Sequence, residues 1–393
     1  MPIWEKRNQL PFQEKLQREM ARVGLDAMLL ILPENIYYST GYASNFAYIT
    51  GEVGRTVAVV PAEGKCGVVC GEFEKLAAES CGDIEVNAYP MWMYIEDYCR
   101  GREKMDIVPD LNKTFRIAME MLNLRPGAKL GIEYAAMPHT KFEYLAEVVG
   151  RENLVDCMPV MVECRKIKTP WEIEVMREAA RVDDTVMRKI MPMIDVGMTE
   201  CEVANLFHRL AYEESKELTN VVQVHTLGAD FSPVMIFRHK PLQPGDICRL
   251  DGSTNVACYS SDIARTFAVG GSVLPERQHI FDTLLRAQDK AFSMIGPGVP
   301  FADVFNEMQK FISSEIPGFI RGHYGHSLGC GRDAEELPRI STMPGCFEPN
   351  MIFCVEFPYY SSRNHNYNIE DEILITENGI EQLTFTNRSL FVK

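Results

Sequence analysis

The chain has 393 residues, of which 46% are hydrophobic and 24% charged, and its formal net charge is −15 at pH 7. This length usually exceeds one compact core, so we expect two globular domains. The negative charge argues against nucleic acid and anionic membranes as partners. No apolar stretch has the length of a signal peptide or a membrane-spanning helix, and the twelve cysteines are scattered without a CxxC pair, so we expect a cytoplasmic protein with reduced thiols.

Helix-like and strand-like segments alternate from residue 8 to about 160, which is the pattern of an α/β domain. Amphipathic runs predict the helices, and apolar runs bounded by turn residues predict the strands. The predicted helices cover 12–24, 111–124 and 138–150, and the predicted strands cover 25–32, 55–71 (two strands), 129–134 and 155–163. We place the N-terminal domain at residues 1–160.

The second domain, residues 161–393, opens on a helix over 165–194. Thr169 is a favourable N-cap, and Pro170 suits the first helical position. Thr199 begins a second helix in the same way. The later predicted helices are 278–295 and 301–314, and the predicted strands are 221–228, 233–237, 246–253, 260–269, 351–360 and 368–376.

Four carboxylates occupy strand positions where the pattern predicts apolar side chains. Asp251 and Asp262 belong to two successive strands, and Glu356 and Glu370 belong to two more. Buried acids are destabilising unless they are paired or bind a cation. Side chains on neighbouring strands approach to about 5 Å, so each pair can share a metal ion. One such acid alone could equally be a hydrogen-bonded core residue, but four together predict a metal centre.

The charges of this centre predict two metal ions. Four carboxylates and one neutral imidazole balance two divalent cations and leave a bridging water that the ions acidify to hydroxide. The glycine-rich segment RGHYGHSLG offers His323 and His326 as candidates for the imidazole. A set of oxygen ligands with a single nitrogen favours Mn²⁺, with Co²⁺ or Zn²⁺ as alternatives.

Several segments resemble the motifs of the pita-bread metalloenzymes, the family of prolidase, aminopeptidase P, methionine aminopeptidase and creatinase. GDICRLDGSTNVACYSSDIARTF carries two aspartates eleven apart, GHSLG is similar to the metal-histidine motif, and MIFCVEFP and NIEDEILITENG are similar to the two glutamate strands. The resemblance is strong over roughly 163–393, and the earlier part with NIYYSTGY resembles the creatinase-type N-terminal domain. The implied fold is an α/β N-terminal domain of the creatinase type followed by an α+β pita-bread catalytic domain.

The resemblance also implies roles for individual residues. The implied metal ligands are Asp251, Asp262, His326, Glu356 and Glu370. Glu356 would act as general base for the bridging water, and His239 would stabilise the tetrahedral species or protonate the leaving nitrogen. Arg265 matches a family arginine and is more consistent with a structural role. His323 stays open between contact with a metal ligand and a role in its loop.

Three positions depart from the peptidase pattern. Asp333 stands nearest to the place of a second histidine, Asn368 replaces the arginine of an R-I-E-D motif, and Phe357 follows Glu356 where the family has proline. We expect all three on the substrate side of the metals.

The preferred functional hypothesis is an Xaa-Pro peptidase like prolidase or aminopeptidase P. The alternative is a small-molecule enzyme on the same fold, either an ectoine hydrolase- or creatinase-like C–N hydrolase or a dimethylsulfoniopropionate lyase-like enzyme, and a third reading is a non-enzymatic binding module.

The expected substrate is therefore a short peptide or a small molecule, and the resemblance implies a homodimer.

Aromatic residues are concentrated in segments 35–49 and 89–101. In dimers of this family the N-terminal domain often edges the partner's active site, so one or two of these rings could enclose a cationic substrate. Ordinary packing of the rings is the alternative.

Overall fold

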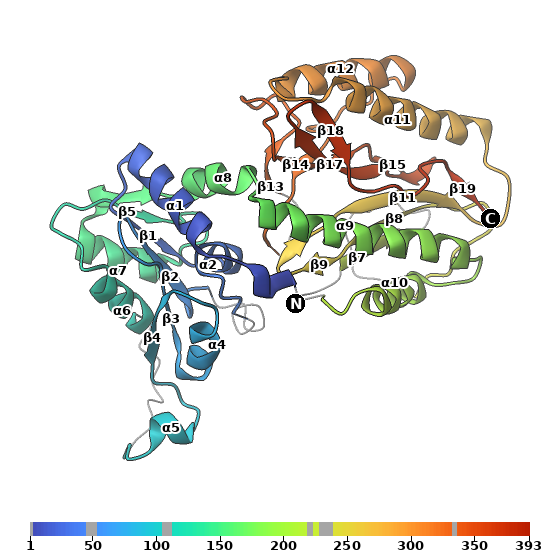
Figure 1. Cartoon of the computed structure of the whole chain (residues 1–393). Coiled ribbons are helices and arrows are strands. Elements are labelled where there is room, and N and C mark those ends of the chain that lie inside the picture. Colours follow the sequence, from blue (N-terminus) through green and yellow to red (C-terminus); the bar gives the residue numbers. More distant parts are fainter. Residues whose placement is uncertain (1–2, 45–52, 104–111, 218–222, 228–238, 332–335) are drawn as a thin grey trace. The chain divides into compact units, whose positions relative to one another are not determined.

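The computed structural model describes residues 3–44, 53–103, 112–217, 223–227, 239–331 and 336–393 (Figure 1). The chain divides into two compact units, Lys6–Arg165 and Lys166–Lys393, the second of which includes Met1–Glu5. The boundary expected at residues 160 and 161 falls inside helix α8 (Met158–Lys166).

The N-terminal unit contains a six-stranded sheet in the order β4-β3-β2-β1-β5-β6. The central strand β1 pairs antiparallel with β2 and parallel with β5, so the sheet is mixed. Its strands are β1 (Ala27–Leu30), β2 (Val57–Pro61), β3 (Gly67–Gly71), β4 (Glu85–Tyr89), β5 (Leu130–Ile132) and β6 (Leu154–Asp156). The helices in its described residues are α1 (Leu10–Val23), α2 (Pro33–Thr40), α4 (Lys75–Glu79), α5 (Glu96–Cys99), α6 (Lys113–Leu122), α7 (His139–Val149) and α8, with short 3₁₀ turns at Glu72–Glu74 and Arg151–Asn153.

Helices cover both faces of this sheet. Phe115 of α6 and Leu145 of α7 share a buried cluster with Leu29 and Val69, whereas Ala78 of α4 packs with the alternate positions of β3. These contacts confirm the predicted α/β architecture.

The strand predicted over 155–163 is wrong beyond its first residues. β6 ends at Asp156, whose carboxylate accepts a hydrogen bond from the N–H of Met158, and α8 begins there. Pro159 fits the first turn of a helix, where its missing N–H is not needed. A short apolar run does not distinguish a strand from a helix by its periodicity, which explains the error.

The C-terminal unit holds a sheet whose described strands follow the order β13-β12-β14-β17-β11-β8-β7, with β18 paired to β17 and β19 to β11. These strands are β7 (Gln223–Leu227), β8 (Ile247–Ser253), β11 (Ile263–Ala268), β12 (His326–Ser327), β13 (Glu336–Arg339), β14 (Ile352–Glu356), β17 (Glu370–Thr376), β18 (Gly379–Gln382) and β19 (Phe391–Val392). Two small hairpins join neighbouring strands: β9 (Asn255–Val256) with β10 (Tyr259–Ser260), and β15 (Tyr359–Ser361) with β16 (His365–Tyr367). The predicted strand over 233–237 lies outside the described residues.

The long helices that the structure describes beside this sheet are α9 (Pro170–Ile190), α10 (Glu200–Glu214), α11 (Pro275–Met294) and α12 (Phe301–Glu315), and short 3₁₀ turns occur at Ile3–Lys6 and Met191–Met193. The predicted starts of the first two are confirmed. Thr169 forms a capping box with Glu172, and Thr199 forms one with Glu202, which satisfies N–H groups that the first helical turn leaves without partners.

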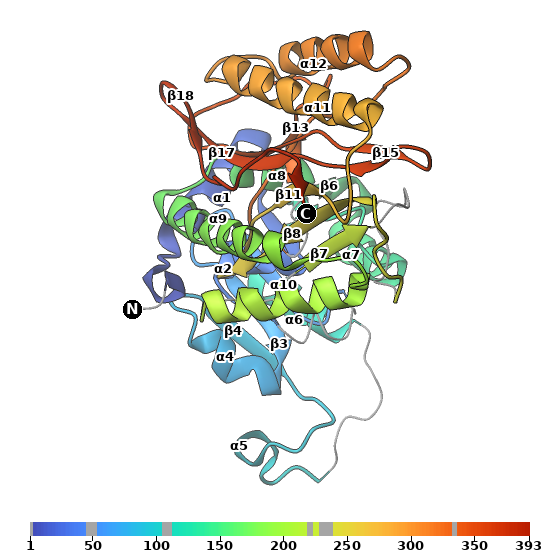
Figure 2. The same cartoon turned by 90° about the vertical axis from the view of Figure 1, so that its right-hand side faces the viewer.

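The helices pack on the sheet in two pairs. α9 and α10 share a core with Leu250 of β8 and Phe267 of β11. α11 and α12 share another with Phe353 of β14 and Ile373 of β17, and Figure 2 shows the two pairs above and below the sheet. Successive residues of a strand point to opposite faces of the sheet. The neighbours of these core residues in each strand therefore point away from the helices that cover that strand.

Candidate metal centre

The acids of the C-terminal unit lie in one row across four neighbouring strands. Glu356 is directly opposite Glu370, Glu370 is opposite Ala264, and Ala264 is opposite Asp251. Directly opposite residues share a face of the sheet, and Asp262, two residues before Ala264, shares that face as well. Asp251 is directly opposite Ala264, so Asp251 and Asp262 lie on one face of the sheet without being direct partners.

His326 brings an imidazole to the same face. It is opposite Cys354, which precedes Glu356 by two residues on β14. Its Nε2 lies 3.7 Å from Glu370 Oε1 and 3.9 Å from Asp262 Oδ2, and one ligand atom from each of these three residues lies within 4.8 Å of the others. Atoms bound to one ion at about 2.1 Å lie at most about 4.2 Å apart, so a small shift lets all three bind the same cation.

The tautomer of His326 fits a metal ligand. Its Nδ1 is 3.2 Å from the carbonyl oxygen of Ser327, which can only accept, so Nδ1 carries the proton. The lone pair of Nε2 then points toward the carboxylates of Asp262 and Glu370. A lone pair beside two carboxylate oxygens is favourable only when a proton or a metal ion lies between them, and a hydrogen bond of this kind on the other ring nitrogen is common for metal-bound histidine.

The raised pKa values of the acids also indicate that positive charge is required at this site. Burial raises the pKa of Asp262 and of Glu370 well above its usual range, and the negative charges of neighbouring acids raise both further. Burial also raises the pKa of Glu372 to about 8, and this carboxylate accepts a hydrogen bond of 2.8 Å from the N–H of Asp262. Asn368 donates to Glu370 Oε2 at 3.1 Å. Without metal ions these acids hold protons, and bound cations would replace the protons.

The two acids at the ends of the row are paired with arginines. Arg249 Nη1 is 3.0 Å from Asp251 Oδ2, and Arg321 donates a hydrogen bond to Glu356. His323 Nδ1 lies 3.4 Å from Glu356 Oε1, so the structure places this histidine beside a candidate ligand. Burial by itself would raise the pKa of Glu356, but the positive charge of Arg321, which also donates a hydrogen bond to it, lowers the pKa overall.

Sequence reasoning did not single out Arg249 or Arg321. Arg249 precedes Asp251 by two residues on the same strand, so the alternation that places Asp251 on the inner face also places this arginine there. A charged residue at such a position was a detectable signal. Arg321 offered no comparable signal, because it belongs to a loop whose path the sequence does not reveal.

His239 and Arg265 are not part of the acid row. His239 is exposed, and no contact found within the described ranges links it to the acids. Hydrogen bonds from Thr199 lower the pKa of Glu202 on α10, and the charge of His239 lowers it further. Arg265 is buried and donates to the carbonyl oxygen of Glu370 at 2.7 Å and to Asp371 at 2.6 Å, in agreement with a structural role.

The three departures from the peptidase pattern differ in location. Phe357 is fully buried in the core beneath α11 and α12, where its ring stacks on Tyr324 with centroids 5.2 Å apart. The expectation that it faces the substrate is wrong, because Phe357 directly follows Glu356 and so points to the other face. Asn368 does lie at the centre, through its contact with Glu370. Asp333 lies outside the described residues.

The aromatic residues of the two predicted clusters differ in exposure, and Tyr89 and Tyr98 are half-buried. Tyr37, Tyr38 and Tyr42 are buried, and the Tyr38 ring packs edge-on against Phe12 with centroids 5.1 Å apart. Trp92 and Tyr94 are exposed. Phe46 and Tyr48 lie outside the described residues. Packing explains the buried group, and a contact between the exposed pair and a substrate stays a prediction.

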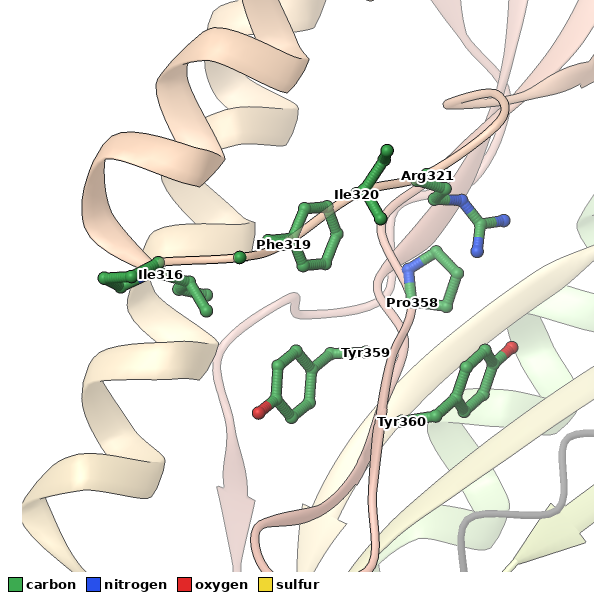
Figure 3. A pocket seen from close by; sticks show the side chains of 9 residues that line it. Ile316, Phe319, Ile320, Arg321, Pro358, Tyr359 and Tyr360 are labelled. Atoms are coloured by element: carbon green, nitrogen blue, oxygen red, sulfur yellow. The ribbon is translucent and has the colours of Figure 1, made fainter.

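A cavity of about 320 Å³ opens at the Arg321 end of the acid row. It is lined by two short segments, Ile316–Arg321 and Pro358–Tyr360 (Figure 3). In this view the side chains of Arg321 and Tyr360 extend to the same side, whereas Tyr359 extends to the other. The cavity thus has apolar walls and one positively charged side chain, that of Arg321, which contacts a candidate metal ligand.

Comparison with known proteins identifies the family. The profile of metallopeptidase family M24 matches residues 174–377, which is more than half of the chain, and that of the Creatinase/Prolidase N-terminal domain matches residues 13–167. This chain belongs to metallopeptidase family M24. The resemblance drawn from the motifs is confirmed, and this M24 chain is a metal-dependent hydrolase whose family uses divalent ions.

Two relatives of this M24 chain match over nearly their whole length. An Xaa-Pro dipeptidase of Pyrococcus horikoshii is 27% identical over 385 residues, covering 96% of this chain and 97% of the relative. An uncharacterised peptidase of Bacillus subtilis is 25% identical over 382 residues, covering 96% and 99%.

Solved structures share the fold. The prolidase from Thermococcus sibiricus superposes with a TM-score of 0.83 at 23% identity over 99% of this chain and 100% of that one. The X-Pro aminopeptidase from Thermotoga maritima gives 0.78 at 21% over 97% and 99%. These similarities confirm the creatinase-type domain followed by a pita-bread domain. No helix of the described residues combines the length and apolar character needed to span a bilayer.

Proposed function

We propose that this M24 chain is a dipeptidase that hydrolyses the peptide bond before proline and binds two divalent metal ions. The proposed ligands are Asp251, Asp262, His326, Glu356 and Glu370. The observation that carries this proposal is the row of buried and half-buried acids beside His326 Nε2, whose charges require cations. The Xaa-Pro dipeptidase among the relatives, which aligns over 97% of its length, supports the substrate class.

The proposed chemistry assigns a role to each residue around the row. Held by the five proposed ligands, two divalent ions would supply Lewis acidity toward the substrate carbonyl and toward a water molecule. Glu356 is suited to take the proton of that water, because its lowered pKa keeps it ionised at neutral pH. The positive charge of Arg321 keeps Glu356 in that state, and Asn368 orients Glu370.

His239 is left out of this proposal. Its side chain is exposed beside Glu202, and the described contacts give it no route to the acid row. Protonation of the leaving nitrogen is proposed for the acid that has received the proton of the water, Glu356, as general base catalysts often return that proton as acids.

The native ion, the assembly and the compartment are further parts of the proposal. An oxygen-rich set with one nitrogen supports Mn²⁺ over Co²⁺ and Zn²⁺. All twelve cysteines are free thiols, and most are buried, which supports the reducing cytoplasm. A homodimer is proposed from the family resemblance alone.

The experiment that tests the function is a parallel assay of the purified, Mn²⁺-supplemented protein. The substrates are Xaa-Pro dipeptides, a longer Xaa-Pro peptide, ectoine, creatine and dimethylsulfoniopropionate. We expect cleavage of the Xaa-Pro dipeptides. Turnover of one of the three small molecules, with the dipeptides left intact, would instead establish the small-molecule alternative.

A further inference from the structure

The backbone of Asp262, a proposed metal ligand, lies where the pairing of β11 with β17 has ended. Continued by two residues, that pairing would place Asp262 opposite Glu372. The backbone of Glu372 is occupied by other partners, because its carbonyl oxygen accepts from the N–H of Leu383 at 2.8 Å and its N–H donates to Thr384 Oγ1 at 3.1 Å. The peptide groups of Asp262 therefore need partners other than a neighbouring strand.

Two buried side chains supply these partners. Glu372 Oε1 accepts a hydrogen bond of 2.8 Å from the N–H of Asp262, and the thiol of Cys354 donates to the carbonyl oxygen of Asp262 over a sulfur–oxygen distance of 3.0 Å. Both side chains are fully buried. Because the N–H and the C=O group of Asp262 are both held, the direction in which its carboxylate leaves the backbone is restricted.

Cys354 and Glu372 form a pair beside the acid row. They are directly opposite each other on β14 and β17, and His326 is directly opposite Cys354 on its other side. Each member of the pair lies two positions from an acid of the row, Glu356 or Glu370, so all of them share one face of the sheet. The pair therefore attaches the ligand that precedes β11 to the two strands that carry the glutamate ligands.

Packing alone does not explain a glutamate at position 372. A buried carboxyl group is destabilising unless its polar atoms are paired, and Glu372 Oε2 has no hydrogen-bond partner among the described residues. An apolar side chain would avoid this penalty. The contact of Glu372 with Asp262 gives the acid a purpose, because the groups of a metal site must be held to within about 0.5 Å by the residues around them.

We propose that Cys354 and Glu372 are positioning residues for the metal ligand Asp262. By holding both of its peptide groups, they place its carboxylate near His326 Nε2 and Glu370, where one cation can bind all three. Their effect depends on the reach of their hydrogen bonds and not on charge. This inference rests on the metal centre of the proposed function, and it is independent of the substrate.

The role of Glu372 is tested by calorimetric titration of the metal-free protein with Mn²⁺. Glu372→Asp keeps the carboxylate but withdraws it from the Asp262 N–H, so it should lower the affinity about 10- to 100-fold, the range typical of residues that orient a ligand. Glu372→Gln keeps an acceptor oxygen at full reach and should bind Mn²⁺ within about threefold of the wild type. Weak binding by the glutamine variant, or unchanged binding by the aspartate variant, would overturn this role.

The role of Cys354 is tested by the same titration with two variants that differ by one atom. Cys354→Ala removes the donor and should lower the affinity at least about tenfold, whereas Cys354→Ser keeps a donor and should recover most of it. Cys248→Ala is the matched control, because Cys248 is buried on the opposite face of the sheet, in the core beneath α9 and α10, and it should bind as the wild type does. Equal affinities of the alanine and serine variants at position 354, or an equal loss in the control, would overturn this role.

The titration contains no substrate, so its result stands whether or not the protein cleaves Xaa-Pro dipeptides. A wild type that binds Mn²⁺ tightly, with all variants equal to it, overturns the positioning pair and leaves the metal centre intact. A wild type that binds no Mn²⁺ contradicts the metal centre itself, and the positioning role with it.

Discussion

Glu356 and Glu370 are directly opposite each other on the antiparallel strands β14 and β17, and both are buried. Like charges at directly opposite positions destabilise a sheet. Glu356 is paired with Arg321, whereas Glu370 has a raised pKa and faces the Nε2 atom of His326. This arrangement is stable only when protons or metal ions neutralise the acids, and the following predictions depend on that requirement.

Ala264 separates Asp251 from Glu370 in the row, and its small side chain leaves space between the two carboxylates. Ala264→Leu should weaken metal binding at least about tenfold, because a larger group would force the carboxylates apart in a packed interior. Titration with Mn²⁺ measures this effect. Ala264→Ser, which adds one atom, is the control and should bind metal nearly as the wild type does. Equal affinity of the leucine variant would show that Ala264 does not lie between the ligands.

The stability of the metal-free protein should fall as pH rises from about 4.5 toward 8. The pKa values of Asp262, Glu370 and Glu372 are raised in the folded state, that of Glu372 to about 8. The folded protein therefore holds protons that the unfolded chain releases above about pH 4.5, and the stability that they contribute is lost as pH rises through the folded values. Glu356 acts in the opposite direction, since its lowered pKa favours the folded state at higher pH.

The measurement is the melting temperature across this pH range, with a chelator and with added Mn²⁺. Mn²⁺ should remove the decline, because ions that bind deprotonated ligands stabilise the folded state more as pH rises. A metal-free protein whose stability rises steadily from pH 5 to 8 would contradict the assignment of the buried acids.

The exposed position of His239 beside Glu202 predicts a small effect of its removal. His239→Ala should keep kcat on Xaa-Pro dipeptides within about threefold of the wild type. The role implied by the family resemblance predicts instead a loss of about 100-fold or more with metals still bound. Steady-state kinetics with parallel metal analysis decides between the two.

The sequence allowed much of this architecture to be predicted because local signals agreed with the fold. Thr169 and Thr199 are N-cap residues that predicted the starts of their helices. The acids of the row were recognisable because they interrupt apolar strands. The run 155–163 was assigned incorrectly, because a short apolar segment suits either a strand or a helix.

Contacts between segments that are distant in the chain could not be predicted from the sequence. The pairing of Arg321 with Glu356 depends on the path of a loop, and the strand register that places Ala264 opposite Asp251 depends on the β9–β10 hairpin. Phe357 was assigned to the wrong face of the sheet. Its position one residue after Glu356 predicts the opposite face, because successive strand residues alternate between faces.

Counting metal ions per chain tests the central claim most directly. Elemental analysis of the Mn²⁺-loaded protein should find two ions in the wild type and fewer than one in Asp262→Ala and in Glu370→Ala, because each change leaves partner acids around an incomplete site. Glu381→Ala is the matched control, since Glu381 pairs with Arg177 at the surface, and it should retain both ions. Two ions in either site variant would contradict the account.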